Sequence, residues 1–418
     1  MPTFRIKGPT FLNGKVRISG AKNSILPIIA ASLLAESSST FDEVPFLMDV
    51  KIMCELIESL GAKVYYQEDK SRLTIDPSGV DKVTAPYDLV NKMRASFLVA
   101  GPLLAKKQKA KISLPGGCAI GPRPVDLHLK GFMAMGAVII YNHGYIEAKT
   151  RHRLKGAKIY LDFPSVGATE NIMMAASLAD GQTIIENAAI EPEIVDLSTY
   201  LVSMGADIRG AGTDTIKING VKSLEGSNHT IIPDRIEAGT LMVATAMTGG
   251  DVIIENVVPS HLKPISAKLR EANIEIADEL TSIHIKADRR LKPLDIKTHP
   301  YPGFPTDMQA QMTSLMTRAT GTSMIVETIF ENRFMHINEL KRMGAKIKID
   351  GRSAIVEGTT KLTGAQVKTT DLRAGAALII AALSAEGLSE ITDAYHIDRG
   401  YVNIDQKLRQ LGADIQRQ

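Results

Sequence analysis

A short motif that recurs at nearly constant intervals constrains the fold of this chain more than any other feature. The motif is an apolar residue followed by Gly-Ala, a polar residue and a β-branched residue, and in one weaker copy asparagine replaces the glycine. The copies are centred on Gly61, Gly136, Gly205, Asn273, Gly344 and Gly412. The intervals between them are 75, 69, 68, 71 and 68 residues. A period near 70 residues indicates six copies of one supersecondary unit.

Each unit has the same predicted order of elements: an apolar helix, a β-branched strand, an amphipathic helix and a hairpin. The apolar helices are expected at 23–36, 94–107, 169–180, 238–249, 308–320 and 372–386. The amphipathic helix ends at the Gly-Ala motif, where the glycine acts as a C-cap. A hairpin is clearest around Asp350-Gly351, a dipeptide typical of two-residue turns.

The two ends of the chain complement each other. Residues 3–8 form an alternating strand with no helix before it, and the sixth unit ends after one hairpin strand. We therefore expect the first and last strands to pair. The sequence predicts an α/β (α+β) fold of two lobes with three units each: residues 22–232 form one lobe, and residues 1–21 with 233–418 form the other. A single ring of six units also fits the pattern.

Composition excludes some classes of protein. Hydrophobic residues make up 44% and charged residues 23% of the 418 positions, and the net charge is +3, so nothing demands a nucleic-acid partner. The only cysteines are Cys54 and Cys118, which fits a reducing compartment and gives no metal cluster. No secretory signal or membrane-spanning run is apparent. We expect a cytoplasmic protein without a membrane anchor.

The stretch from Leu114 to Asp126, LPGGCAIGPRPVD, is the first candidate for chemistry. Its glycines and prolines favour a loop, and Arg123 lies between two prolines. A free cysteine usually packs as a small apolar residue. Here the Gly-Gly pair before Cys118 and the polar flank after it argue against burial, so we predict a reactive thiol beside a cation.

Polar residues recur where the apolar helices begin. They are Lys22-Asn23, Arg94, Ser165-Val166-Gly167, Asp234-Arg235, Asp307, and Asp371 with Arg373. Helix N-termini attract anions, and arginine side chains such as those of Arg333 and Arg399 bind carboxylates and phosphates. We therefore predict a site for phosphates and carboxylates. The alternatives are exposed surface charges and, for Asp307 and Asp371, simple helix N-caps.

Six motifs in register give the chain a family resemblance. They are SGAKNSILP, PGGCAIGPRPVDLH, PSVGATEN, FPTDMQAQ, ENRFMH and DLRAG. With these motifs the chain resembles the UDP-N-acetylglucosamine 1-carboxyvinyltransferase family of enolpyruvyl transferases. The resemblance implies two lobes, each a threefold-repeated inside-out α/β barrel. It also implies transfer of the enolpyruvyl group of phosphoenolpyruvate to a UDP-sugar by addition and elimination, the first committed step of peptidoglycan synthesis, without a metal or cofactor.

The resemblance also implies roles for individual residues. Cys118 matches the acid that protonates phosphoenolpyruvate, and Asp307 matches the carboxylate beside the sugar hydroxyl. The phosphoenolpyruvate contacts would be Lys22, Asn23, Arg123, Arg333, Arg373 and Arg399, with Lys22 and Arg399 also catalytic. The sugar-nucleotide contacts would be Asn23, Arg94, Arg123, Pro124, Val125, Asp126, Leu127, Ser165, Val166, Gly167, Asp307 and Ile329.

Two positions depart from the family pattern. Phe163-Pro164 and the segment from Phe46 to Met48 stand where some members carry lysines. Two other functions remain as alternatives. One is the sister enolpyruvyl transferase that acts on shikimate 3-phosphate, which shares the fold but does not use a loop cysteine. The other is a non-catalytic repeat scaffold or nucleic-acid clamp, against which the near-neutral charge argues.

Overall fold

The computed structural model describes residues 2–113, 125–288, 290–359 and 361–418. Contacts divide these residues into two compact units. The central unit comprises residues 20–113 and 125–232, and the terminal unit comprises residues 2–19 together with the described residues from 233 to 418. The predicted Cys118, Arg123 and Pro124 lie outside the described residues.

The described residues form six four-stranded sheets, three in each unit, and all six share one topology. The first two strands are parallel, and the third and fourth are antiparallel to their neighbours. In the central unit the sheets are β14(Asn228–Thr230)-β3(Ser39–Asp42)-β5(Arg72–Asp76)-β4(Lys63–Gln67), β6(Thr84–Ala85)-β7(Lys109–Ser113)-β9(Tyr145–Lys149)-β8(Val138–Asn142) and β10(Lys158–Tyr160)-β11(Gln182–Glu186)-β13(Thr215–Asn219)-β12(Asp207–Arg209).

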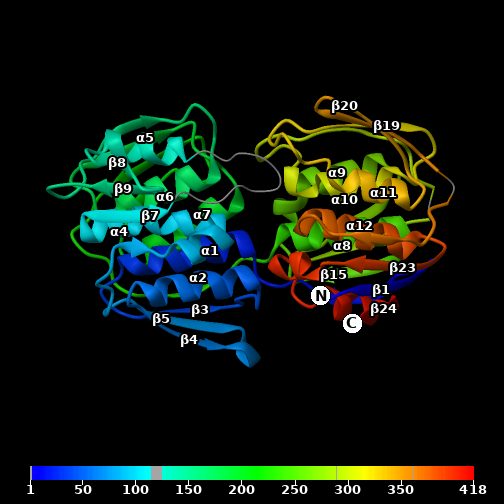
Figure 1. Cartoon of the computed structure of the whole chain (residues 1–418), viewed down its shortest axis with the longest axis horizontal. Helices are drawn as coiled ribbons and strands as arrows, with labels where there is room; N and C mark the ends of the chain where they lie inside the picture. Colours follow the sequence, from blue (N-terminus) through cyan, green and yellow to red (C-terminus); the bar gives the residue numbers. More distant parts are fainter. Residues whose placement is uncertain (1, 114–124, 289, 360) are drawn as a thin grey trace. The chain divides into compact units, whose positions relative to one another are not determined.

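The terminal unit repeats this plan, and its third sheet contains both ends of the chain. Its sheets are β2(Asn13–Arg17)-β15(Asp251–Glu255)-β17(Ser282–Lys286)-β16(Glu275–Asp278), β18(Asp295–Lys297)-β19(Thr322–Val326)-β21(Ser353–Glu357)-β20(Lys346–Asp350) and β22(Gln366–Lys368)-β23(Gly387–Thr392)-β1(Phe4–Gly8)-β24(Asp414–Arg417). Strand β1 lies between β23 and β24, with Ile6 opposite Ser389 and Ile415 (Figure 1). The first and last strands therefore pair, as the sequence indicates.

One strand in each sheet was not predicted. It precedes the apolar helix and pairs in parallel with a strand that follows such a helix, as β10 does with β11. Most of these strands are only two or three residues long, which leaves too few positions for an alternating pattern to be recognised. Two of these strands belong to a different unit from the helix that follows them. Strand β2 precedes α1 of the central unit but pairs with β15 of the terminal unit, and β14 precedes α8 of the terminal unit but pairs with β3 of the central unit. The exchange follows from the passage of the chain between the units near Gly20 and Pro233.

The apolar helices form the interior of each unit. They are α1 (Lys22–Ala31), α4 (Ala100–Lys107), α6 (Val166–Ser177), α8 (Arg235–Thr248), α10 (Gln309–Met316) and α12 (Leu372–Ser384). In the terminal unit α8, α10 and α12 pack against one another (Figure 1). Every residue of α8 from Ile236 to Thr248 is buried, because its small residues allow close packing on all sides. The strands bury alternate residues, so the sheets cover the helices with one face each.

The sheets surround the inner helices without closing. In the described part of the chain, each sheet ends in two edge strands and none forms a closed barrel. The predicted helix–strand–helix–hairpin unit is present six times. The predicted helix at 94–107 begins as a 3₁₀ segment, η3 (Arg94–Val99), before α4.

The amphipathic helices end at the repeat motif. They are α2 (Met48–Ser59), α5 (Asp126–Ala134), α7 (Pro192–Ser203), α9 (Lys263–Glu271), α11 (His336–Arg342) and α13 (Ile404–Gln410). The five motif glycines have φ between 91° and 111°, and Asn273 has φ 74°. This left-handed geometry confirms their role as helix stops. The hairpin loop between β20 and β21 is Gly351-Arg352, one residue later than predicted.

The remaining helical segments are short connections. They are η1 (Ser32–Leu34), η2 (Glu68–Lys70), α3 (Tyr87–Lys92), η4 (Pro259–Leu262), η5 (Thr306–Met308) and η6 (Ala394–Arg399). Two of them carry predicted site residues, since Asp307 lies in η5 and Arg399 ends η6.

Candidate active site

Asp307 forms the core of the candidate site in the terminal unit. Its Oδ1 accepts a hydrogen bond from Arg333 Nη2 at 2.8 Å, and its Oδ2 accepts one from Arg373 Nη2 at 2.9 Å. The arginine side chains are 4% and 5% exposed, whereas that of Asp307 is 27% exposed. The structure therefore brings these three predicted residues together, with the carboxylate as the most accessible member.

The two arginines control the ionisation of Asp307. Burial alone would raise the pKa of its carboxyl group, but Arg373 and Arg333 outweigh burial and hold the pKa well below the usual value. Arg333 also has one buried nitrogen, Nη1, that has no hydrogen-bond partner among the described residues. The cluster thus presents an ionised carboxylate and spare donor capacity, which suit a hydroxyl group and an anion respectively.

The aspartates at the starts of the inner helices have two different roles. Asp234 and Asp371 are N-caps of α8 and α12, and each accepts hydrogen bonds from two backbone N–H groups. Asp307 is not an N-cap, because both of its oxygens bind arginine side chains. The N-cap alternative is therefore right for Asp371 and wrong for Asp307.

Arg399 and Ile329 lie in connecting segments of the same unit. Arg399 ends η6 and is half-buried, two residues before Tyr401, whose hydroxyl accepts from Arg373. The N–H of Ile329 donates to Glu327 Oε1 at 2.8 Å. Glu327, which is 1% exposed, also accepts from Thr306 Oγ1 at 2.8 Å, next to Asp307. Sequence reasoning missed Glu327, although an acidic residue within the predicted strand SMIVETI was a usable signal.

Lys22 is the first residue of α1 in the central unit. Its Nζ lies 2.8 Å from Asp49 Oδ2, and the two side chains are 10% and 3% exposed. Asp49 was not predicted, although an acidic residue in the first turn of α2 marks it. A buried carboxylate beside Lys22 keeps the ammonium group in one place. Asn23 follows on the same turn and is half-buried.

A second buried carboxylate holds the start of α1. Ser24 Oγ donates to Asp196, whose other oxygen lies 2.9 Å from His229 Nε2. The N–H of Ile232 also contacts Asp196 Oδ2 at 3.4 Å. Asp196 therefore links α1, β14 and the end of the central unit. Through Ser24 it also holds the first turn of α1, which carries Lys22 and Asn23.

Segments that carry predicted sugar-nucleotide residues of the central unit meet at His128. Burial, together with the nearby Arg94 charge, lowers the pKa of His128 to about 3, so the ring is neutral. Its Nδ1 accepts from Asn171 Nδ2 at 3.0 Å. Gly167 packs on the ring so closely that a Cβ there would lie 3.3 Å from His128 Cε1. Three segments thus meet: the starts of η3 (Arg94), α5 and α6.

The ends of these helices differ in exposure. Val125 is buried at the start of α5, Asp126 is exposed and Leu127 is half-buried. Ser165 caps α6 by accepting from Ala168 N, with Val166 and Gly167 half-buried beside it. A helix N-terminus can also bind an anion.

The two departures from the family pattern are exposed aromatic side chains. Phe163 is 44% exposed, two residues before the N-cap Ser165. Phe46 is 50% exposed and stacks on Tyr66 with ring centroids 5.7 Å apart. These positions offer apolar rings in place of ammonium groups.

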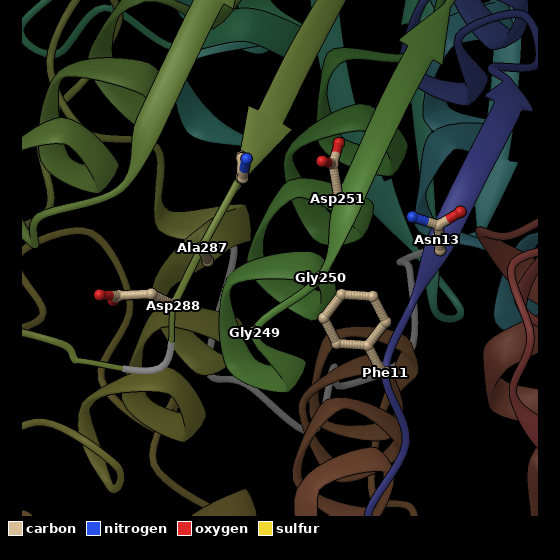
Figure 2. A pocket seen from close by; sticks show the side chains of 8 residues that line it. Phe11, Asn13, Gly249, Gly250, Asp251, Ala287 and Asp288 are labelled. Carbon is tan, nitrogen blue, oxygen red and sulfur yellow. The ribbon is translucent and has the colours of Figure 1, made fainter.

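A hollow of about 430 Å³ lies elsewhere in the terminal unit, at the C-terminal end of α8 (Figure 2). It is lined by Phe11, Asn13, Gly249, Gly250, Asp251, Lys286, Ala287 and Asp288. Asp251 already pairs with His284 at 2.6 Å, and Asp288 with Arg290 at 3.0 Å. None of the lining residues belongs to the Asp307 cluster, so the hollow is a separate feature.

The described ranges contain neither a metal-binding cluster nor a helix suited to span a membrane. No group of three or more His, Cys, Asp or Glu residues there is placed to hold a metal ion. None of the helices in that part of the chain combines the length and apolar character needed to cross a bilayer.

Comparisons with known proteins identify the family. A family model described as EPSP synthase (3-phosphoshikimate 1-carboxyvinyltransferase) matches residues 6–408. UDP-N-acetylglucosamine 1-carboxyvinyltransferase 1 of Caldanaerobacter subterraneus subsp. tengcongensis is 62% identical over 406 residues, which cover 97% of each chain. The chain belongs to the UDP-N-acetylglucosamine 1-carboxyvinyltransferase family of enolpyruvyl transferases. The resemblance seen in the six motifs is thereby confirmed.

Other members of the enolpyruvyl transferase family agree over the whole length. UDP-N-acetylglucosamine 1-carboxyvinyltransferase 2 of Carboxydothermus hydrogenoformans is 58% identical over 419 residues, covering 100% of this chain and 99% of its own. The solved structure of the enolpyruvyl transferase NikO from Streptomyces tendae has a TM-score of 0.90 at 25% identity, covering 100% of this chain and 98% of that one. EPSP synthase from Acinetobacter baumannii, with a TM-score of 0.78 at 20% identity and full coverage of both chains, shares the fold.

Proposed function

We propose that the chain transfers the enolpyruvyl group of phosphoenolpyruvate to the 3-hydroxyl of UDP-N-acetylglucosamine and releases phosphate. The observation that carries the proposal is the 62% identity, over 97% of both chains, to a relative named for this sugar nucleotide. This reaction would make the chain a cytoplasmic enzyme of peptidoglycan synthesis, with consequences for cell-wall biogenesis, cell shape, division and the cell cycle. It would also make the chain a target of fosfomycin.

The reaction balances as an addition followed by an elimination. The Cys118 thiol donates a proton to C3 of phosphoenolpyruvate, and the sugar oxygen forms a bond to C2 while Asp307 takes the hydroxyl proton. The resulting tetrahedral ketal then loses phosphate from C2 and a proton from C3, which returns to the Cys118 thiolate, while Asp307 gives up its proton to the departing phosphate. The double bond re-forms, and the product is the enolpyruvyl ether of the sugar nucleotide.

The role of Asp307 as a base is supported by its two arginines. While Arg333 and Arg373 bind the carboxylate, its low pKa keeps it ionised and ready to accept a hydrogen bond from the sugar hydroxyl. Anionic phosphoenolpyruvate beside the same two arginines would offset part of their positive charge, so the carboxylate would become a better base without movement of either guanidinium group.

The cations of the proposal hold phosphoenolpyruvate. They are Lys22, Arg123, Arg333, Arg373 and Arg399, with Asn23 beside Lys22. Fixed positive charge stabilises the negative charge that develops on the three-carbon acid in the transition state. The pairing of Lys22 with Asp49 and of Arg373 with Asp307 supports this role, because a paired cation needs little reorganisation when a substrate binds.

The sugar nucleotide is bound by a second group of residues in the proposal. Its members are Asn23, Arg94, Arg123, Pro124, Val125, Asp126, Leu127, Ser165, Val166, Gly167, Asp307 and Ile329. The meeting of the Arg94, Val125–Leu127 and Ser165–Gly167 segments around neutral His128 supports it. Exposed Phe163 adds a ring near the N-terminus of α6, where a nucleobase can stack.

Phosphate release from phosphoenolpyruvate tests the proposal. The purified chain is assayed with UDP-N-acetylglucosamine, with shikimate 3-phosphate and with neither. We expect rapid release only with the sugar nucleotide. Release with shikimate 3-phosphate but not with the sugar nucleotide would assign the chain to the sister activity. No release in any of the three assays would favour the non-catalytic alternative.

A further inference from the structure

The hydroxyl of Tyr401 lies at the centre of a buried hydrogen-bond network in the terminal unit. Tyr401 is 2% exposed. Its oxygen lies 3.1 Å from Arg373 Nη1, 3.3 Å from Gln311 Nε2 and 3.0 Å from Thr240 Oγ1. These partners belong to α12, α10 and α8, so one hydroxyl contacts all three inner helices.

The direction of each hydrogen bond follows from the available protons. The hydroxyl of Thr240 donates its single proton to Ile236 O at 2.7 Å, so it accepts from Tyr401. The lone pairs of the Tyr401 oxygen remain for Arg373 and Gln311, which are donors at those atoms. The hydroxyl therefore acts as an acceptor for the buried guanidinium of Arg373.

This contact fixes the guanidinium of Arg373 at both ends. One nitrogen, Nη2, donates to Asp307 Oδ2, and the other, Nη1, donates to Tyr401. The guanidinium carbon also lies 5.5 Å from the centroid of the Tyr401 ring. Because the guanidinium is planar, holding Nη1 sets the direction in which Nη2 meets Asp307.

The same network reaches Asp307 by a second route and adjoins Arg399. Gln311 Nε2 donates both toward Tyr401 and to the backbone oxygen of Asp307, at 2.9 Å. The N–H of Tyr401 donates to Ile397 O at 3.1 Å, which closes the turn that carries Arg399. Tyr401 therefore contacts Gln311, which binds Asp307, and it also closes the turn that carries Arg399.

We infer that Tyr401 is a positioning residue for the transfer reaction: it orients Arg373, and through Arg373 the Asp307 carboxylate. The inference rests on the proposed function. Tyr401 is too deeply buried to be a catalytic residue, and no contact with a substrate is required of it. Removal of its hydroxyl leaves a buried charged donor without an acceptor and frees the guanidinium to move.

A double-mutant cycle tests this inference. Tyr401→Phe removes only the hydroxyl, and Arg373→Lys keeps the charge but cannot bond Asp307 and Tyr401 at once. The measured quantity is kcat/KM for phosphoenolpyruvate at saturating UDP-N-acetylglucosamine. We expect a loss of about tenfold for Y401F and about 100-fold for R373K. In the R373K background, Y401F should cost less than about twofold more, because the interaction is already lost.

Tyr200 provides a matched control in the central unit. It is fully buried, and its hydroxyl donates to Ser39 Oγ at 2.7 Å. Tyr200→Phe removes the same atom from an equally buried ring. Y200F should lower the melting temperature as Y401F does, yet leave kcat/KM within about twofold of the unmodified chain. If Y401F does not fold, Thr240→Val takes its place, since it removes the acceptor of the Tyr401 proton.

Three results would overturn the inference. A folded Y401F as active as the unmodified chain would do so, as would losses from Y401F and R373K that multiply to about 1000-fold. A Y200F loss equal to that of Y401F would show a general effect of buried hydroxyl removal. If the unmodified chain itself releases no phosphate, the proposed function fails first and this inference fails with it.

Discussion

Asp307 owes its ionisation to neighbours that are distant in sequence. Arg333, on a loop, and Arg373, in the first turn of α12, contact its two oxygens, and both are almost fully buried. The Asp307 carboxylate accepts a hydrogen bond from each arginine, so its removal leaves two positive charges close together in a protein interior. At this scale, folding and chemistry depend on the same carboxylate.

Replacement of Asp307 by Asn tests this dependence. D307N should lower turnover at least about 100-fold, because an amide cannot accept the hydroxyl proton. It should also lower the free energy of unfolding by about 3 kcal/mol at neutral pH. Since the pKa of Asp307 is depressed in the folded state, the carboxylate stabilises the fold fully above its ordinary pKa of about 4.

The stability difference should therefore depend on pH. It should be constant between about pH 8 and 5 and shrink as the pH falls toward the depressed folded-state pKa, because protonation removes the same charge. Denaturant unfolding at several pH values measures it. Asp42→Asn, at the exposed pair with Arg72, is the control and should change little. A D307N difference that grows in acid would contradict the account.

Cys54 and Cys118 should differ in reactivity. Burial, with Glu58 and Glu55 nearby, raises the pKa of Cys54 to about 12, so roughly one molecule in 10⁴ carries the thiolate at pH 8. We expect iodoacetamide and fosfomycin to modify Cys118 and to spare Cys54 in the folded chain, as measured by peptide mass mapping. Unfolding in guanidinium should expose Cys54 to iodoacetamide. Equal labelling of both cysteines in the folded chain would contradict this.

At the scale of elements, Glu327 connects the two segments that carry Ile329 and Asp307. Its Oε1 accepts from Thr298 Oγ1, at 3.0 Å, and from the N–H groups of Ile329 and Phe330, while its Oε2 accepts from Thr306 Oγ1. One carboxylate thus fixes both the loop after β19 and the start of η5. The loop positions depend on a group with four acceptor bonds, which only a carboxylate provides.

Glu327→Gln should loosen these loops. The amide NH₂ group faces at least one N–H or O–H donor, and that donor loses its acceptor. We expect KM for UDP-N-acetylglucosamine to rise about tenfold, with a smaller change in kcat. Glu357→Gln, at an exposed position in the same sheet, is the control and should leave KM unchanged. An unchanged KM in E327Q would argue against a positioning role.

The sequence predicts the repeated elements well but not the contacts between them. The inner helices and the glycine stops were found because each depends on local composition and periodicity. The short strand before each inner helix was missed, since three residues carry no period. Asp49, Glu327 and Tyr401 were missed because their importance comes from partners that only the fold brings near. Asp307 was found through its motif, but its two arginine contacts could not be read from spacing.

At the scale of the whole molecule, the terminal unit is completed by the first residues of the chain. Strand β1 fills the space between β23 and β24, and it buries Phe4 and Ile6 in the core. Without β1 the two neighbouring strands have no common partner. The terminal unit therefore joins strands from both ends of the chain in one sheet, although more than 200 residues separate β2 from α8.

Phe4→Ala should destabilise the terminal unit selectively. Removal of a fully buried phenyl ring costs about 3–5 kcal/mol, which lowers the melting temperature by roughly 10 °C for a unit of this size. Hydrogen exchange should then accelerate in β23, β24 and their helices more than in the central unit. Phe11→Ala, at a ring that is 54% exposed, is the control. Uniform acceleration in both units would contradict the assignment of β1.

The fate of the C3 hydrogens of phosphoenolpyruvate tests the account most directly. Addition places a solvent-exchangeable proton on C3, and elimination removes one of three hydrogens from the resulting methyl group. In D₂O, mass spectrometry should therefore find deuterium in the enolpyruvyl group of the UDP-N-acetylglucosamine product. A product formed without deuterium would contradict the addition–elimination mechanism, and the absence of any enolpyruvyl product would contradict the proposed transfer itself.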